Sequence, residues 1–290
     1  MKGRFFLLLV LCGLFGACIH HPSESRNLSK DTKQYWANFD FSDSTQVDNY
    51  EVVEARFATY ITLLEDPQLT PPVAGELLQK TLHQAGANDA IFNLFWELCE
   101  KYLYSPESPV RDEELYIYAL QSLIASNHVD GYHKLRPRYQ LNMALQNRLG
   151  HPATEFTYTE ADGHQSTLYS LAADYTILFF NNPDCEACEQ LRAQLQRSPL
   201  IRILEKLGRL RVLALYSNTE EDQTRWQATV DSYPTSWIMA YDAGAQLHYK
   251  GLYDLRGIPC LYLLDRHKRV LYKGATTTTA ITAALRKDLF

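Results

Sequence analysis

The chain has 290 residues, of which 46% are apolar, and its formal net charge is −6. This length is enough for two domains of ordinary size, each with a substantial hydrophobic core. The negative charge and the lack of a long Lys or Arg run argue against nucleic acid as a partner.

The first 18 residues have the pattern of an export signal. Lys2 and Arg4 give a positive start, residues 5–15 are apolar, and Gly16-Ala17-Cys18 offers a small-residue processing site. The apolar stretch is shorter than the ~20 residues that span a bilayer. Its end resembles a bacterial lipobox, with Phe15 in place of the usual Leu. We therefore expect a lipoprotein signal peptide over residues 1–18 and, through a lipid on Cys18, a membrane anchor facing the periplasm; simple secretion is the alternative.

Residues 19–46 are polar and predict a tether, although the aromatic residues between 35 and 41 could dock on the domain that follows. Residues 47–149 have helical periodicity and predict an all-α domain of five short amphipathic helices. The first helix is expected to bury Val52, Phe57, Tyr60, Ile61 and Leu64, and the fifth Tyr139, Met143, Leu145 and Leu149. Nothing in this domain indicates chemistry. Cys99 is expected to be a buried structural thiol, and His128 and His133 are poor candidates for a metal site.

Gly150-His151-Pro152 marks the start of a second domain, over residues 150–290, in which strand and helix signals alternate. Strands are expected near residues 155–159, 175–180, 210–216, 236–241, 260–264 and 269–273. Helices are expected over residues 185–197, 200–207, 219–231 and 279–288. This alternation predicts an α/β domain in which a central mixed sheet is flanked by helices.

Two cysteines, Cys185 and Cys188, stand where the apolar strand at 175–180 gives way to the first turn of a helix. Unpaired N–H groups and the positive end of the helix dipole gather at such a turn. Both favour a thiolate, which is the form of cysteine that attacks disulfides. A Cys-x-x-Cys pair in this setting is typical of a thioredoxin-like redox pair.

The order of elements, with Cys185-Glu186-Ala187-Cys188 at the first strand–helix turn and Gly257-Ile258-Pro259 before the last hairpin, resembles the thioredoxin superfamily. Residues 150–156, Asp162-Gly163 and Leu168 look like the lead-in of membrane-tethered thiol–disulfide oxidoreductases of the TlpA/ResA kind. The helical domain is similar to an uncharacterised domain that precedes thioredoxin-like domains in Bacteroidales lipoproteins, and it implies no activity.

The resemblance implies a role for each site residue. Cys185 would be the exposed attacking thiol and Cys188 the resolving thiol. Pro259 would be a cis-proline packed against the pair, and Ile258 would offer backbone hydrogen bonds to a peptide. The implied partners are protein disulfides or dithiols and an unidentified thiol redox partner, with no cofactor.

The sequence departs from the family pattern around the cysteines. Asp184 replaces the usual aromatic residue, and together with Glu186 and Glu189 it disfavours a thiolate, so the pKa of Cys185 is expected to be less depressed than in relatives. Phe179 stands where many relatives have a buried carboxylate, which leaves the proton acceptor for Cys188 unidentified. Cys260 follows Pro259 directly, and it is either an accessory thiol that traps a mixed disulfide or a small buried residue.

The leading hypothesis is a thiol–disulfide oxidoreductase of the bacterial cell envelope. A non-catalytic interaction or assembly lipoprotein built on a thioredoxin-like scaffold is the alternative from another class. A thiol peroxidase is disfavoured because no Thr or Ser lies three residues before Cys185. A copper or zinc site would need a histidine beside the two cysteines, and none has a diagnostic spacing, so we expect no metal.

Overall fold

The computed structural model describes residues 32–105, 107–217 and 223–290. The expected signal peptide, the lipid site at Cys18, most of the tether and the expected helix start at 219–222 lie outside the described residues. Within the described ranges, no helix combines the length and the apolar character needed to cross a bilayer.

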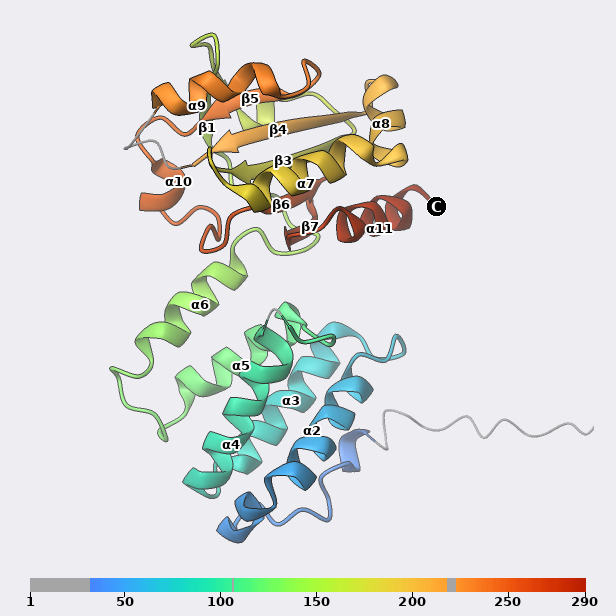
Figure 1. Ribbon diagram of the computed structural model, residues 1–290. Helices are drawn as coiled ribbons and strands as arrows, with labels where there is room; N and C mark the ends of the chain where they lie inside the picture. Colours follow the sequence, from blue (N-terminus) through green and yellow to red (C-terminus); the bar gives the residue numbers. More distant parts are fainter. Residues whose placement is uncertain (1–31, 106, 218–222) are drawn as a thin grey trace, which may run out of the picture.

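The first part of the chain, which we call the helical half (residues 32–149; Figure 1), is built from helices. Two of the predicted helices begin at side-chain caps: Asn88 accepts hydrogen bonds from the N–H groups of residues 90 and 91, and Asp112 accepts one from the N–H of residue 115. The elements are η1 (Ser44–Asn49), α2 (Tyr50–Leu64), α3 (Pro71–Ala85), α4 (Asp89–Cys99), the π-helical turn η2 (Glu100–Tyr104), α5 (Glu113–Ala125) and α6 (Leu135–Leu145).

The helical half has one aromatic-rich core. Trp36, Phe39 and Phe41 are buried in it beside Phe57 and Phe95, so this stretch of the predicted tether is part of the folded half. Two details of the predicted helix faces are wrong. Val52 is 68% exposed, and its neighbour Val53 is buried instead, because Val53 lies one helical turn before Phe57.

The second wrong detail concerns α6. Tyr139 and Leu145 are about half exposed. The helix begins two residues before Pro137, and the residues it buries are Pro137, Gln140, Met143 and Ala144. Leu149, which was expected on the same apolar face, lies beyond the end of the helix and is also about half exposed.

The second part of the chain, which we call the sheet half (residues 150–290), contains a seven-stranded mixed sheet of order β2-β1-β5-β4-β3-β6-β7. Its strands are β1 (Thr157–Glu160), β2 (Gln165–Thr167), β3 (Tyr175–Asn181), β4 (Leu210–Tyr216), β5 (Ile238–Tyr241), β6 (Cys260–Leu264) and β7 (Val270–Ala275). Strands β3, β4 and β5 are parallel, and the other pairings are antiparallel. The helical segments are η3 (Leu168–Ser170), α7 (Glu186–Arg197), α8 (Pro199–Lys206), α9 (Gln223–Thr229), η4 (Val230–Ser232), α10 (Gln246–Tyr249) and α11 (Thr278–Leu289).

The sheet is covered on both faces, as the continuous apolar run of β3 predicted. Ile177 and Phe179 point into a core shared with α7, α8, α9 and α11, whereas Leu178 and Phe180 point into a second core on the opposite face. Side chains from η3 and α10 and from residues 153–158 fill this second core. The predicted fold class is therefore confirmed, although the short helix α10 was not predicted.

Helix α6 leads from the helical half into the sheet half (Figure 1). Hydrogen bonds and an ion pair join the two halves. Leu149, four residues past the end of the helix, forms a bridge with Val270 of β7. The Lys273 ammonium donates to the carbonyl oxygens of Ala144 and Gln146 and pairs with Glu113 at the start of α5, 2.5 Å away. These contacts attach the helical half to the last strand of the sheet.

Candidate active site

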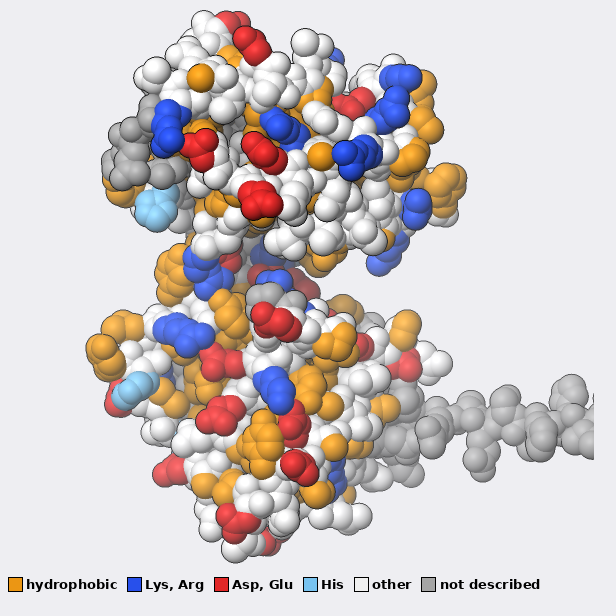
Figure 2. Space-filling model, in the orientation of Figure 1, with side chains coloured by type: hydrophobic (Ala, Val, Ile, Leu, Met, Phe, Trp, Pro, Cys, Tyr) orange, Lys and Arg blue, Asp and Glu red, His pale blue; other side chains and the backbone are white. Residues whose placement is uncertain are grey.

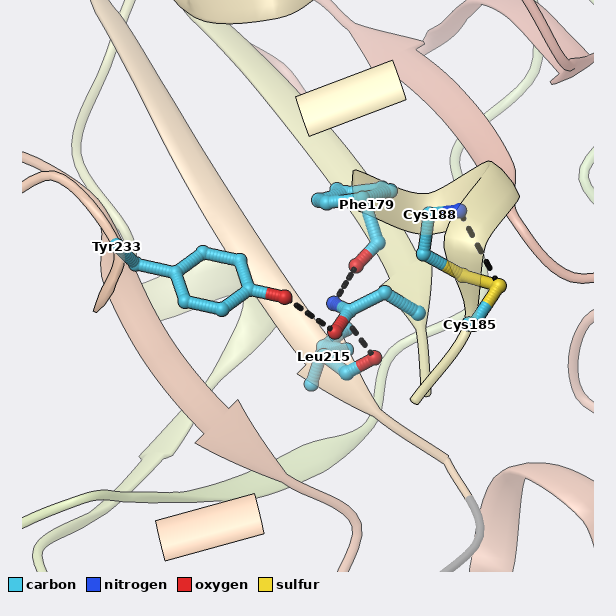
Figure 3. Close-up of a disulfide and its surroundings, with 6 residues drawn as sticks. Phe179, Cys185, Cys188, Leu215 and Tyr233 are labelled. Carbon is cyan, nitrogen blue, oxygen red and sulfur yellow. Dashed lines mark hydrogen bonds between the residues drawn. A yellow bond between two sulfur atoms is a disulfide. The ribbon is translucent and has the colours of Figure 1, made fainter. Parts of the chain in front are cut away.

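The two cysteines of the predicted redox pair lie at the junction of β3 and α7 (Figure 3). All seven residues of β3 are buried, and the chain then turns through Asp184, whose φ of +57° is in the left-handed region. Cys185 is the N-cap of α7, and its Sγ accepts a hydrogen bond from the Cys188 N–H at 3.1 Å. The two residues form a disulfide, with 5.1 Å between their Cα atoms.

The two sulfur-bearing residues differ in exposure. Cys188 is 1% exposed and packs with Leu191 and Leu195 in the core under α7. Cys185 is partly buried at the edge of the same core. The pair therefore has one partly exposed member and one member in the interior.

A positive charge that the sequence did not suggest lies close to the pair. Arg225 of α9 places its Nη2 2.8 Å from Oδ2 of Asp184, the residue directly before Cys185. Three carboxylates were expected to oppose a thiolate here, but one of them is paired. Arg225 lies about 40 residues after the cysteines, so only the parallel arrangement of β3, β4 and β5 brings α9 to this edge of the sheet.

The predicted peptide-binding residues lie at the same edge of the sheet. The Ile258–Pro259 peptide bond is cis, as the resemblance implied. Cys260 pairs with Phe180 near the end of β3, so Pro259 stands beside the strand end from which the turn to Cys185 starts. Pro259 is buried, and Ile258 packs against the cores on both faces of the sheet.

A neutral polar network replaces the buried carboxylate of many relatives. Phe179 is fully buried and packs edge-to-face on Trp237. The buried Asn181, at the end of β3, donates through Nδ2 to the carbonyl oxygens of Phe179 and Leu215, and its Oδ1 accepts from the Tyr233 hydroxyl at 3.1 Å (Figure 3). Burial raises the pKa of Tyr233, so its hydroxyl stays protonated and able to donate at neutral pH.

The Arg192 guanidinium of α7 lies over the ring of Tyr233, 4.5 Å from its centre, and donates to Ser232. The Tyr233 hydroxyl in turn reaches the end of β3. This arrangement links the helix that follows the cysteines to the strand that precedes them. A single Tyr far along the chain gave no sequence signal for this role.

The other candidate residues lie apart from the pair. Cys260 is buried in the core on the opposite face of the sheet from Cys188. Burial raises the pKa of Cys260 to about 12, and the nearby Asp254 carboxylate adds to the shift. This position favours the interpretation of Cys260 as a small buried residue.

The remaining candidates lie in the helical half. Cys99 is fully buried there, and burial raises its pKa strongly. His128 and His133 bond to Asp89 and Asp130, respectively. Among the residues that the structure describes, no cluster of three or more metal-binding side chains is present.

Comparisons with known proteins cover both halves. Residues 22–147 match the model of a domain of unknown function, DUF5106. None of the curated proteins matches the chain. A thioredoxin-like protein from Bacteroides caccae is 34% identical over 98% of this chain and 99% of its own, with a TM-score of 0.81.

Two further solved structures align with about half of the chain. The C-terminal domain of an uncharacterized protein from Bacteroides fragilis is 41% identical over 48% of this chain and 98% of its own, with a TM-score of 0.45. A domain of a possible thiol-disulfide isomerase from Cytophaga hutchinsonii is 24% identical over 50% of this chain and 97% of its own, with a TM-score of 0.40. The full-length match to the Bacteroides caccae structure decides the family: the chain belongs to the thioredoxin-like proteins that this structure represents.

Proposed function

We propose that this protein is a thiol–disulfide oxidoreductase that exchanges its Cys185–Cys188 pair with protein disulfides in the bacterial cell envelope. The observation that carries the proposal is the bonded pair at the N-terminus of α7, with Cys185 at the surface and Cys188 in the core. This difference supports attack by Cys185, because an incoming protein disulfide reaches the outer sulfur more easily than the buried one.

The exchange proceeds in two steps. The Cys185 thiolate attacks one sulfur of the substrate disulfide, forms a mixed disulfide and releases the other substrate sulfur as a thiolate. Cys188 then loses its proton and attacks the Cys185 sulfur, which breaks the mixed disulfide, releases the second substrate thiolate and closes the Cys185–Cys188 bond. Two electrons pass to the substrate, and a thiol partner regenerates the dithiol. The same steps in reverse oxidise a substrate dithiol.

Local structure supports the thiolate of Cys185. The first N–H groups of α7 have no partner within the helix, and the Cys188 N–H already points at the Cys185 sulfur. The same N–H can donate to Cys185 when its sulfur is a thiolate as well as when it is part of the disulfide.

The cis Ile258–Pro259 segment stands beside the strand end from which the turn to Cys185 starts. We assign to Ile258 the backbone hydrogen bonds that hold the substrate peptide in an extended form. Pro259 has no N–H and would shape this surface without competing for those bonds.

Insulin reduction tests the activity. Purified protein with dithiothreitol should speed the precipitation of insulin, and Cys185→Ser should remove the effect. Cys188→Ser, reduced and then freed of dithiothreitol, should instead accumulate a mixed disulfide that non-reducing electrophoresis resolves, because no second thiol is then present to complete the exchange. Cys99→Ala, far from the pair in the helical half, is the matched control. A wild-type protein that reduces no disulfide under any reductant would refute the function.

The cell-envelope part of the proposal depends on residues 1–18. Labelling of the expressed protein with a fatty acid should depend on Cys18, and Cys18→Ala should release the protein from the membrane fraction. Label that persists in Cys18→Ala would contradict the anchor without affecting the redox chemistry.

A further inference from the structure

The connection between α10 and β6, residues 250–259, is held in place partly by the helical half. This connection ends in the cis Ile258–Pro259 bond, directly before β6. Figure 2 shows basic and acidic side chains close together where the two halves meet. Several of the contacts at this junction go to residues 251–256 of the connection.

Arg256 makes the most extensive of these contacts. Its guanidinium forms two hydrogen bonds to the carboxylate of Asp254, at 2.8 and 2.6 Å, and its Nη1 lies 2.5 Å from the hydroxyl of Tyr104. The same group lies over the rings of Tyr104 and Tyr139, 5.7 and 6.0 Å from their centres. A planar guanidinium that binds a carboxylate, a hydroxyl and two rings is fixed in orientation as well as position.

The charge on Asp254 keeps this arrangement intact. Burial is the largest single influence and acts to raise the pKa of Asp254, but the hydrogen bonds from Arg256 and the positive charges of Arg256 and Lys273 together hold the pKa below its usual value. The carboxylate therefore stays ionised at neutral pH, and the paired hydrogen bonds persist.

The side chain of Tyr104 is held in place by packing within the helical half. Tyr104 is the last residue of the π-helical turn η2, and its ring stacks on Tyr116 of α5, with 4.9 Å between the ring centres. Tyr116 is buried in the core of the helical half. The position of the Tyr104 hydroxyl is therefore set by the packing of α4, η2 and α5.

Asn147 provides a second contact between the helical half and the connection. Its Nδ2 donates to the Leu252 carbonyl at 2.8 Å, and its Oδ1 accepts from the Thr154 N–H at 2.7 Å. Asn147 is 5% exposed, so both bonds are shielded from water. The connection is thus fixed at Leu252 and again at Arg256, two residues before Ile258.

We propose that the helical half is a positioning element for the redox site, acting through the contact between Tyr104 and Arg256 to set the place of Ile258 and Pro259 relative to the cysteine pair. This inference rests on the proposed function. Ile258 follows Arg256 by two residues, and two residues of extended chain span at most about 7 Å. The position of Arg256 therefore restricts where Ile258 can lie. A protein substrate needs both the sulfur and the peptide-binding backbone, whereas a small disulfide needs only the sulfur. The contact should therefore affect the binding of protein substrates and leave the reactivity of Cys185 unchanged.

The test compares Tyr104→Phe with Glu113→Gln in the full-length protein. Tyr104→Phe removes only the hydroxyl and keeps the ring on Tyr116. Glu113→Gln also weakens a contact between the halves; its partner Lys273 lies on β7, and both side chains line the cavity beside Asp254 without a hydrogen bond to residues 250–259. KM and kcat are measured with insulin, and the rate of attack by Cys185 is measured separately with hydroxyethyl disulfide. Backbone amide NMR signals of Gly257 and Ile258 report the position of the connection directly.

Tyr104→Phe should raise KM for insulin about three- to tenfold, less than the full loss of a charge-assisted hydrogen bond because the Arg256 side chain is 45% exposed, with an unchanged rate on hydroxyethyl disulfide. Arg256→Lys, which cannot make the paired bonds to Asp254, should act in the same direction. Glu113→Gln should change neither rate. The signals of Gly257 and Ile258 should move in Tyr104→Phe and stay in place in Glu113→Gln.

Equal KM values and equal signals in Tyr104→Phe and Glu113→Gln would overturn the positioning role while leaving the oxidoreductase function intact. A wild-type protein inactive on both disulfides would refute the proposed function, and the NMR comparison would still decide whether Tyr104 positions the connection.

Discussion

The helical half and the sheet half are stabilised in different ways. The helical half has one core, in which aromatic rings from residues 36–41 and from the helices pack together, several of them edge-to-face. The sheet half has two cores, one on each face of the sheet, and its central strand pairs with strands that lie far away in sequence. The first half depends on local helix formation and the second on long-range pairing.

The same difference explains why a cysteine is inert in one half and well placed for exchange in the other. Cys99 lies at the end of a helix that continues into η2, with its side chain in the core. Cys185 lies where a buried strand ends and a helix begins, so it meets unpaired N–H groups and solvent together. The expected reactivity of Cys185 therefore follows from its place at the junction between strand β3 and helix α7.

The largest expected effect is the difference in alkylation rate between Cys185 and the buried cysteines. In reduced native protein, iodoacetamide should label Cys185 first, and peptide-resolved mass spectrometry should find Cys99 and Cys260 unlabelled until denaturant is added. Because Cys260 is 5% exposed and burial raises its pKa to about 12, its thiol is shielded and still mostly protonated at pH 10, so its labelling should stay far slower than that of Cys185. The expected difference between Cys260 and Cys185 is roughly a thousandfold in rate.

If Cys260 were labelled at a rate near that of Cys185, the interpretation of Cys260 as a small buried residue would be wrong, and the accessory-thiol hypothesis would be favoured. Cys260→Ser provides the matching functional check. It should leave insulin reduction and the trapped mixed disulfide of Cys188→Ser unchanged.

Truncation of Phe95 should have the next largest effect. Its ring is fully buried and contacts Trp36 and Phe57, so Phe95→Ala should lower the free energy of unfolding by about 3–5 kcal/mol. Urea unfolding followed by circular dichroism measures the loss. Phe290→Ala, at a fully exposed phenylalanine, is the control and should change nothing. A cost below about 1 kcal/mol for Phe95→Ala would mean that this cluster is not the main core of the helical half.

Gly75→Ala tests the packing of α3 on α5 with a smaller effect. A methyl group at Gly75 would collide with the ring of Tyr118, which costs about 1–3 kcal/mol, while the better helix propensity of Ala returns up to ~1 kcal/mol. The net result should be a modest loss of stability in urea unfolding. Gly131→Ala, at a site with open space, should show no loss. A stabilised Gly75→Ala protein would show that α3 and α5 can separate without cost.

Periodicity and turn signals predicted most of the fold. The run at 175–180, the turn to Cys185 and the amphipathic helix after it are local patterns, and each one lies where it was expected. The burial of Cys188 follows from the helical period, because Cys188, Leu191 and Leu195 share one face, whereas only the resemblance implied an exposed Cys185.

Contacts between distant segments could not be predicted in the same way. The Arg225 partner of Asp184 and the Tyr104 partner of Arg256 depend on how helices and strands are arranged in space. The inward side of α6 was also mistaken, since this helix packs against α5 with a face that contains Pro137 and Gln140 instead of its large apolar residues. Pattern alone favours burial of Tyr139, whereas the structure places Tyr139 beside Arg256 at the junction.

The smallest expected effect concerns Arg225 and Asp184. Arg225→Gln leaves the Asp184 carboxylate unpaired next to Cys185, which disfavours the thiolate and should slow alkylation of Cys185 at pH 7. Both side chains are about two-thirds exposed, so water and salt screen the interaction, and the change should stay below about threefold. Arg225→Lys keeps the charge and should match the wild type, and about 1 M salt should remove the difference. Asp184→Asn should act in the opposite direction and speed alkylation. If Arg225→Gln and Asp184→Asn both alkylate at the wild-type rate in low salt, side-chain charge does not tune Cys185, and the N–H groups of α7 alone would set its reactivity.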